Sequence, residues 1–126
     1  MSSIKQWNVL VIEDEADSME LVQGLLSYSG IHCAGADSGE DAMRILEQQS
    51  FTLIIVDLAL PGMDGWGVLK AVRSNPRLAH IPCIAITAFH TPELADQAIR
   101  AGFNAYFPKP IDATSFVREL QVIVEG

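Results

Sequence analysis

Short apolar runs alternate along the chain with longer segments in which apolar residues recur every three or four positions. The runs are rich in β-branched residues, which is typical of buried strands in a parallel sheet. The spacing of the longer segments, such as Met19, Val22, Leu25 and Leu26, predicts amphipathic helices. Strands are predicted at residues 8–12, 52–56, 82–86 and 105–107, and a weaker one at 32–35.

Local signals mark where these helices begin and end. Serine, threonine and aspartate side chains cap the first turn of a helix, and glycine commonly follows the last one. A proline at the first helical position and an early acid are further start signals. The first helix is predicted at residues 16–28, with Gly30 beyond its end, and the second begins after Ser38, with Asp41 three residues on. The third is predicted at residues 66–73, before Asn75-Pro76, and the fourth begins at Thr91-Pro92-Glu93 and ends at Gly102. The last begins after Asp112 and has Phe116, Leu120 and Val124 at every fourth position.

Strands and helices therefore alternate in five βα units that fill residues 1–126. Such alternation predicts an α/β fold with a parallel sheet and helices on both of its faces. For five strands, the doubly wound, flavodoxin-like order 2-1-3-4-5 fits best. No linker, repeat or second domain is left over, so we expect a single domain.

Polar residues follow four of the five predicted strands. Glu13-Asp14-Glu15 follow the first, Asp57 the third, Thr87 the fourth and Lys109 the fifth. The carboxyl ends of parallel strands lie at one edge of the sheet, where ligands bind in open α/β folds. The pattern therefore predicts a crevice that brings several carboxylates, a hydroxyl and an ammonium together.

Composition and charge narrow the classes of function. The net charge of −8 argues against nonspecific binding to nucleic acid, which needs a basic surface. No apolar stretch reaches the roughly 20 residues that cross a bilayer, and the amino terminus lacks an apolar signal segment. We therefore expect a cytoplasmic protein without a membrane partner. Cys33 and Cys83 have no metal-like spacing and are expected to be reduced packing residues.

Three carboxylates in one crevice would repel each other, which calls for a compensating cation. Glu13, Asp14 and Asp57 offer the oxygen ligands that Mg²⁺, or Mn²⁺, prefers. Lys109 supplies a second positive charge. A carboxylate held in this way is a poor base but a usable nucleophile toward phosphorus. We therefore expect Asp57 to form an acyl phosphate, while Lys109 and the Thr87 hydroxyl bind phosphoryl oxygens.

This combination of residues resembles the receiver domain of two-component response regulators, and the resemblance runs from Val9 to Val124. The length, without an output domain, looks like a single-domain regulator similar to chemotaxis or cell-cycle receivers. One departure is Glu13, which stands where many receivers have an aspartate; its extra methylene would let it reach Mg²⁺ through water. The motifs that carry the resemblance are Glu13-Asp14, Asp57, Pro61-Gly62-Met63-Asp64-Gly65, Thr87-Ala88 and Lys109-Pro110.

The resemblance implies a phosphorylation-switched signalling protein that catalyses only its own phosphorylation and dephosphorylation. Asp57 would take a phosphoryl group from the phosphohistidine of a sensor histidine kinase or a histidine phosphotransfer protein. The signal would pass to a downstream target protein, without direct contact to nucleic acid. Whether the protein binds such a target or drains phosphate from a kinase stays open.

The resemblance also implies roles for single residues. Asp14 would be the direct Mg²⁺ ligand of the acidic pair, and the backbone carbonyl of Ala59 would complete the ligand set. Thr87 and Tyr106 match a switch pair, in which the aromatic ring rotates inward as the threonine moves. The bond between Lys109 and Pro110 matches one that is cis in the family.

Two other classes of function share parts of this pattern. A dehalogenase-like phosphatase also uses an aspartyl phosphate, but it expects a second acid two residues after the nucleophile, where this chain has Ala59. A pseudo-receiver with a dead site would have lost Asp57, Thr87 or Lys109, and all three are present. Both classes therefore fit the sequence less well than an active receiver.

Three further residues have two interpretations each. Phe89, together with Ala59, could lengthen the life of the acyl phosphate by shielding it, or could simply contact a partner from its loop. His90 is expected to be a surface loop residue rather than a metal ligand or phosphate carrier. Trp66 is expected to pack at the start of a helix, the alternative being a fluorescent neighbour of the site.

Overall fold

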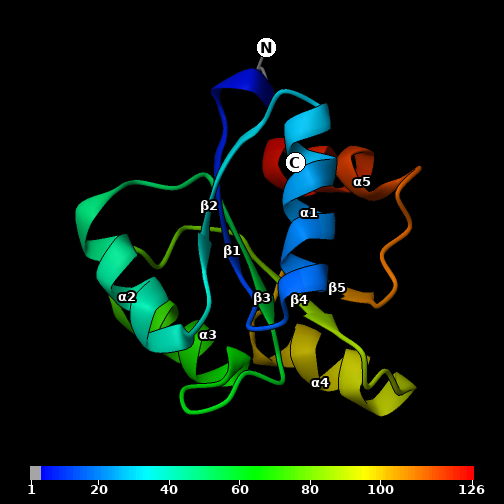
Figure 1. Ribbon diagram of the computed structural model, residues 1–126. Coiled ribbons are helices and arrows are strands. Elements are labelled where there is room, and N and C mark those ends of the chain that lie inside the picture. Colours follow the sequence, from blue (N-terminus) through cyan, green and yellow to red (C-terminus); the bar gives the residue numbers. More distant parts are fainter. Residues whose placement is uncertain (1–3) are drawn as a thin grey trace.

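The computed structural model describes residues 4–126, in which five parallel strands form one sheet with the predicted order β2-β1-β3-β4-β5 (Figure 1). A single 3₁₀ turn, Ile4–Gln6, precedes the sheet. The strands are β1 (Asn8–Ile12), β2 (His32–Ala36), β3 (Leu53–Asp57), β4 (Cys83–Thr87) and β5 (Ala105–Pro108). The helices are α1 (Ala16–Tyr28), α2 (Gly39–Gln48), α3 (Gly65–Ser74), α4 (Pro92–Ala101) and α5 (Phe116–Glu125).

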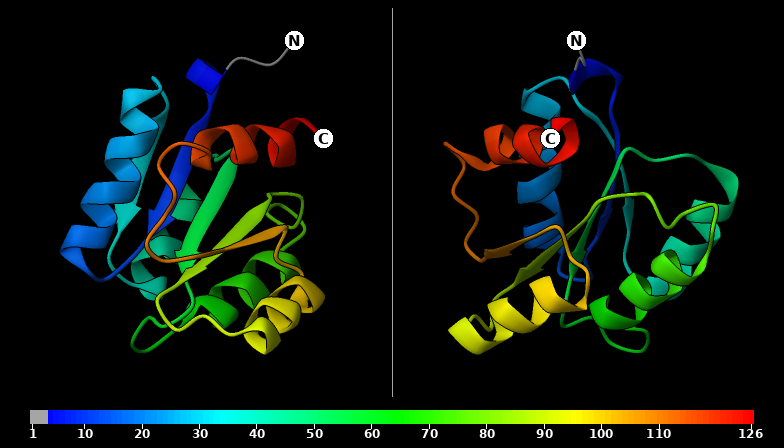
Figure 2. Two further views of the ribbon diagram at one scale, coloured as in Figure 1. Left: turned by 90° about the vertical axis from the view of Figure 1, so that its right-hand side faces the viewer. Right: turned by 180° about the vertical axis from the view of Figure 1, so that it is seen from behind.

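Helices cover both faces of the sheet, as predicted. Two cores result, one with α1 and α5 and the other with α2, α3 and α4 (Figure 2). Successive residues of a strand point to opposite faces, so Val9 and Val11 of β1 pack in the first core and Leu10 and Ile12 in the second. Burial from both sides explains why the strands read as continuous apolar runs rather than alternating ones.

The predicted helix caps are present at α2 and α4. Ser38 Oγ accepts a hydrogen bond from the Asp41 backbone N–H at 3.0 Å, and Thr91 Oγ1 accepts one from the Leu94 N–H at 3.0 Å. Gly30 follows α1 with a φ of 79°, a conformation that favours glycine. None of the helices among residues 4–126 is both long and apolar enough to span a bilayer.

The predicted start of the last helix is wrong. α5 begins at Phe116, and Asp112 does not cap it. The Asp112 carboxylate instead accepts hydrogen bonds from the Thr114 backbone N–H at 2.9 Å and hydroxyl at 2.7 Å. This local turn uses the groups that a helix start would have used. The helix begins where Phe116 reaches the core, with its ring centroid 5.3 Å from that of Phe107.

The register of the strands aligns their carboxyl ends at one edge of the sheet. Asp57, the last residue of β3, pairs with Ile86 of β4, and Thr87 pairs with Pro108 of β5. The backbone N–H of Lys109 donates to the carbonyl of Thr87 at 2.8 Å, which continues the ladder one residue beyond β5. Regular backbone pairing therefore holds the residues that carry the functional side chains.

Candidate functional site

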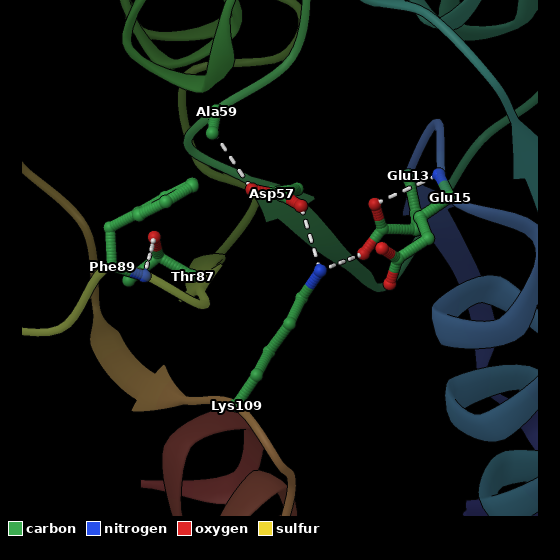
Figure 3. Close-up of polar contacts among 7 residues, drawn as sticks. All are labelled: Glu13, Glu15, Asp57, Ala59, Thr87, Phe89 and Lys109. Atoms are coloured by element: carbon green, nitrogen blue, oxygen red, sulfur yellow. Dashed lines mark hydrogen bonds and ion pairs between the residues drawn. The ribbon is translucent and has the colours of Figure 1, made fainter.

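The residues predicted to form a site do come together where the strands end (Figure 3). Asp57 and Thr87 are the last residues of β3 and β4, so these strands end one residue later than predicted. Glu13 directly follows β1, and Lys109 directly follows β5. Among the described residues, the buried polar side chains are those of Glu13, Asp57 and Thr87. Burying such groups is costly unless they are paired, so this edge differs from an ordinary packing surface.

The Lys109 ammonium joins the two buried carboxylates. Its Nζ lies 2.8 Å from Asp57 Oδ2 and 2.5 Å from Glu13 Oε1 (Figure 3). Burial alone would lower the pKa of Lys109, but the hydrogen bonds with both carboxylates outweigh it and raise the pKa. Burial raises the pKa of Glu13, while the Lys109 contact opposes that rise. Lys109 therefore stays charged between the two acids, and its peptide bond with Pro110 is cis.

The acidic side chains can meet on one cation. One oxygen each from Glu13, Asp14 and Asp57 lies within 4.8 Å of the others. With all three acids ionised, the three carboxylates and the Lys109 ammonium leave two negative charges, which a divalent cation would neutralise. Asp14 is exposed, which leaves room for the waters that Mg²⁺ retains. The donor set therefore fits Mg²⁺, while the Ala59 carbonyl as a further ligand stays a prediction.

Backbone N–H groups add further polar contacts to the site: that of Glu15 donates to Glu13 Oε2 at 3.2 Å, and two more hold Asp57 and Thr87. Ala59 N–H donates to Asp57 Oδ1 at 2.8 Å, so each Asp57 oxygen has a partner. Phe89 N–H donates to Thr87 Oγ1 at 3.1 Å. The Thr87 oxygen acts as an acceptor in that contact, which leaves its hydrogen to donate elsewhere. Sequence reasoning missed all three contacts, because backbone donors carry no signature in residue type.

Gly65 packs directly against the backbone of Asp57. A Cβ on Gly65 would lie 2.6 Å from the Asp57 carbonyl oxygen and 2.8 Å from Leu58 Cα. Backbone atoms cannot rotate away, so we expect Gly65→Ala to lower the free energy of unfolding by about 1–3 kcal/mol, measured by urea denaturation. The control is Gly24→Ala in α1, where a Cβ meets nothing within 4 Å and a gain of about 0.5–1 kcal/mol is expected. Equal effects of the two substitutions would contradict the contact argument.

His90 has a contact that its lone position in the sequence did not suggest. Its Nδ1 lies 3.0 Å from the hydroxyl oxygen of Tyr106, and the ring centroids are 5.5 Å apart. Tyr106 lies on β5 beside Ala85 of β4, so the β4–α4 loop reaches back to the neighbouring strand. Sixteen residues separate the pair, and only the pairing of β4 with β5 brings them together. The expectation of a surface residue holds, since His90 is exposed, but the residue is not isolated.

The remaining expectations concern packing. Cys33 and Cys83 are free, and burial raises the pKa of both thiols, to about 11 for Cys83. Their assignment as reduced packing residues is thus confirmed. Trp66 packs edge-on against Phe103, with ring centroids 5.7 Å apart, which agrees with its expected packing role at the start of α3.

The chain belongs to the response regulator receiver domain family, which it matches over residues 9–121. It is 32% identical to the chemotaxis protein CheY-3 of Vibrio cholerae, over 96% of this chain and 94% of that protein. It is 31% identical to the polar-differentiation response regulator DivK of Brucella ovis, over 90% of this chain and 93% of that protein. The resemblance seen in the sequence motifs is thereby confirmed.

A solved structure extends the comparison to the site. The receiver domain of the sensor histidine kinase PA1611 from Pseudomonas aeruginosa PAO1 matches with a TM-score of 0.86 and 26% identity, over 95% of this chain and 98% of that chain. That structure holds a magnesium ion coordinated in its active-site cleft. Receiver domains are signalling modules, and the acidic cluster of this chain has the composition that such an ion requires.

Proposed function

We propose that this protein is a phosphorylation-switched response regulator in which Asp57 accepts a phosphoryl group from the phosphohistidine of a histidine kinase or a histidine phosphotransfer protein. One observation carries the proposal: Lys109 Nζ lies between the buried carboxylates of Asp57 and Glu13, at 2.8 and 2.5 Å. This contact sets a nucleophile beside a charge that can neutralise a phosphoryl oxygen. Such a regulator works in the cytoplasm as a single receiver domain and acts on no separate substrate.

In the transfer, an Asp57 carboxylate oxygen attacks phosphorus, and the bond between phosphorus and the donor's imidazole nitrogen breaks. The bonding electrons stay on that nitrogen, which leaves as neutral imidazole when the other ring nitrogen carries a proton. Lys109 and the Thr87 hydroxyl bind phosphoryl oxygens, and Glu13 and Asp14 hold the cation with Asp57. Bound Mg²⁺ supplies charge neutralisation, which is the main requirement of phosphoryl transfer.

The output depends on two contacts of the β4–α4 loop. Phe89 N–H donates to Thr87 Oγ1 at 3.1 Å, so a displacement of the Thr87 side chain toward the phosphoryl group would alter this hydrogen bond. The same loop carries His90, whose Nδ1 lies 3.0 Å from the Tyr106 hydroxyl. Movement of Thr87 is thereby coupled to Tyr106, and a downstream target protein reads the altered face of α4, β5 and α5. Phosphorylation biases an equilibrium between two states of this face.

The test uses the protein with Mg²⁺ and acetyl phosphate as a small phosphodonor. Intact-protein mass spectrometry should detect one added phosphoryl group, which hydroxylamine removes because an acyl phosphate is a reactive anhydride. Chelation of Mg²⁺ with EDTA should abolish the labelling. A protein that takes up no phosphoryl group under these conditions would refute the proposed function.

The rival functions have less support. A phosphatase of the dehalogenase type needs an acid at the position of Ala59, which offers only a methyl group and its backbone. An inactive pseudo-receiver would not need the lysine and the carboxylates to be in direct contact, as they are here. Both would leave the protein without stable phosphate on Asp57.

The lifetime of the phosphate provides a further prediction. Ala59 has no polar group to orient an attacking water, and the Phe89 ring extends from its loop toward Asp57 (Figure 3). We expect the double variant Ala59→Asn, Phe89→Ala to lose its phosphate at least about threefold faster, because an amide can position water as in other phosphoryl-transfer sites. The half-life is measured by mass spectrometry after removal of acetyl phosphate. The two single variants are the controls. An unchanged half-life in the double variant would show that Ala59 and Phe89 do not protect the acyl phosphate.

A further inference from the structure

The first turn of α2 touches the loop that joins β3 to α3, although none of the residues of the site lies on α2 (Figure 1). Residues 58–64 form this loop, which begins directly after Asp57. The carboxylate of Glu40 accepts a hydrogen bond from the Met63 backbone N–H, with 3.2 Å between Oε2 and the nitrogen. A side chain of α2 therefore holds the loop that leads away from the phosphoryl acceptor.

Gly39 brings the backbone of α2 against the same residue of the loop. A Cβ on Gly39 would lie 2.6 Å from the Met63 carbonyl oxygen and 2.9 Å from Met63 Cγ. The φ angle of Gly39 is not positive, so its backbone conformation does not require glycine. The close approach of Met63 accounts for the glycine instead, because any other residue at this position would push the loop away.

The Glu40 contact restrains the middle of the loop. At the start of the loop, the Ala59 N–H donates to Asp57 Oδ1 at 2.8 Å. Among residues 4–126, the backbone of residues 60–63 makes one hydrogen bond with another part of the protein, and this is the bond to Glu40. Without it, the loop would be held by its two ends and by side-chain packing.

The path of this loop matters for metal binding because Ala59 lies in it, with a carbonyl that is predicted to bind the cation. A backbone oxygen cannot change rotamer, so its direction follows the path of the loop. A loop that is already held in its binding conformation loses less conformational entropy when the ligand binds. Glu40 is exposed, so its hydrogen bond competes with water and adds little to the stability of the whole fold. Its main effect should therefore be on the loop.

We propose that Glu40 and Gly39 are positioning residues of the metal site, which hold the loop between β3 and α3 so that the backbone of Ala59 faces the cation. This inference rests on the proposed function, since it concerns the cation of the same site. Neither residue contacts the reacting atoms. The alternative role of Glu40 is to stabilise the start of α2, where an acidic side chain is favourable. The two roles predict different effects on Mg²⁺ binding.

Glu40→Ala should weaken Mg²⁺ binding about three- to tenfold, because residues that orient metal ligands contribute to metal affinity. Glu40→Gln keeps an oxygen that can accept the hydrogen bond, so its dissociation constant should stay within about twofold of the wild-type value. Both variants lose the same negative charge, and a difference between them therefore reports the hydrogen bond. Glu47→Ala, at an exposed acid in the last turn of α2, is the matched control and should bind Mg²⁺ as the wild type does. Isothermal titration calorimetry measures the dissociation constants.

The hydrogen bond can also be tested without the metal. In NMR spectra recorded in EDTA, the Met63 amide hydrogen should exchange with solvent at least about fivefold faster in Glu40→Ala than in the wild type, because its acceptor is gone. Glu40→Gln should keep the slower exchange. Gly39→Ala should weaken Mg²⁺ binding at least as much as Glu40→Ala, since its methyl group would displace the Met63 carbonyl. Urea denaturation shows whether each variant is folded and how stable it is.

Acetyl phosphate separates this inference from the proposed function. At saturating Mg²⁺, Glu40→Ala should be labelled within about twofold of the wild-type rate, and a larger deficit should appear only when Mg²⁺ is limiting. If Glu40→Gln loses as much Mg²⁺ affinity as Glu40→Ala, the positioning role is wrong and charge explains the loss. A lower free energy of unfolding in Glu40→Ala with unchanged Mg²⁺ affinity would also contradict it and assign Glu40 to the start of α2 alone. Failure of acetyl phosphate to label the wild type would overturn the proposed function, while Mg²⁺ affinity and amide exchange would still test the positioning role.

Discussion

Asp57→Asn should abolish hydroxylamine-labile phosphorylation, with a loss of at least about 100-fold in labelling rate. The substitution removes the nucleophilic carboxylate and changes little else in the site. The amide oxygen can still accept the hydrogen bond that Ala59 N–H now donates to Oδ1 at 2.8 Å. Glu13 remains to hold the Lys109 ammonium, at 2.5 Å. The measurement is intact-protein mass spectrometry after incubation with Mg²⁺ and acetyl phosphate.

A folding control makes this loss interpretable. Asp57→Asn removes one of three clustered carboxylates, so the thermal midpoint without Mg²⁺ should stay the same or rise. A variant that is folded by this criterion and unlabelled assigns the phosphate to Asp57. Labelling at the wild-type rate would place the phosphate on another residue, and the exposed Asp14 beside it would be the first to test by Asp14→Asn.

The sequence was sufficient to predict the sheet and its functional edge, because both depend on periodic patterns. Burial from both sides makes β1, β3 and β4 continuous apolar runs, and a parallel sheet brings their polar ends together. The predicted strand ends were nearly right: Asp57 and Thr87 are the last residues of β3 and β4 rather than the residues after them. A shift of one residue at a strand end still leaves the side chain at the same edge.

What the sequence did not predict depends on contacts between distant residues or on local competition. Asp112 looks like a helix cap, but its carboxylate is used by Thr114 in a turn before α5. The contact between His90 and Tyr106 arises because β5 lies beside β4. Residue type alone carries none of this information.

Lys109→Met should separate metal binding from phosphorylation. The substitution removes the ammonium from between Glu13 and Asp57, which are 1% and 6% exposed. Labelling by acetyl phosphate should fall at least about 100-fold, because a preorganised charge that stabilises the transferring group is lost. Affinity for Mg²⁺ should rise instead, since a positive charge that competes for the same carboxylates is gone. Isothermal titration calorimetry measures the affinity, and Lys70→Met, at an exposed lysine of α3, is the control.

The same variant should be unstable in a way that depends on pH and on Mg²⁺. In EDTA at pH 7, its free energy of unfolding should be lower than that of the wild type by about 3–5 kcal/mol, because two buried carboxylates lose their partner. Burial already raises the pKa of Glu13, and without Lys109 the pKa should rise further. A carboxyl group whose pKa is higher in the folded than in the unfolded state destabilises the fold above the unfolded pKa. The difference in free energy of unfolding between the wild type and Lys109→Met should therefore shrink as the pH falls from 7 toward 5. Added Mg²⁺ should restore the stability of the variant at pH 7. Urea denaturation measures the free energy of unfolding at both pH values, with and without Mg²⁺. If the difference from the wild type is the same under all of these conditions, Lys109 acts through packing rather than charge.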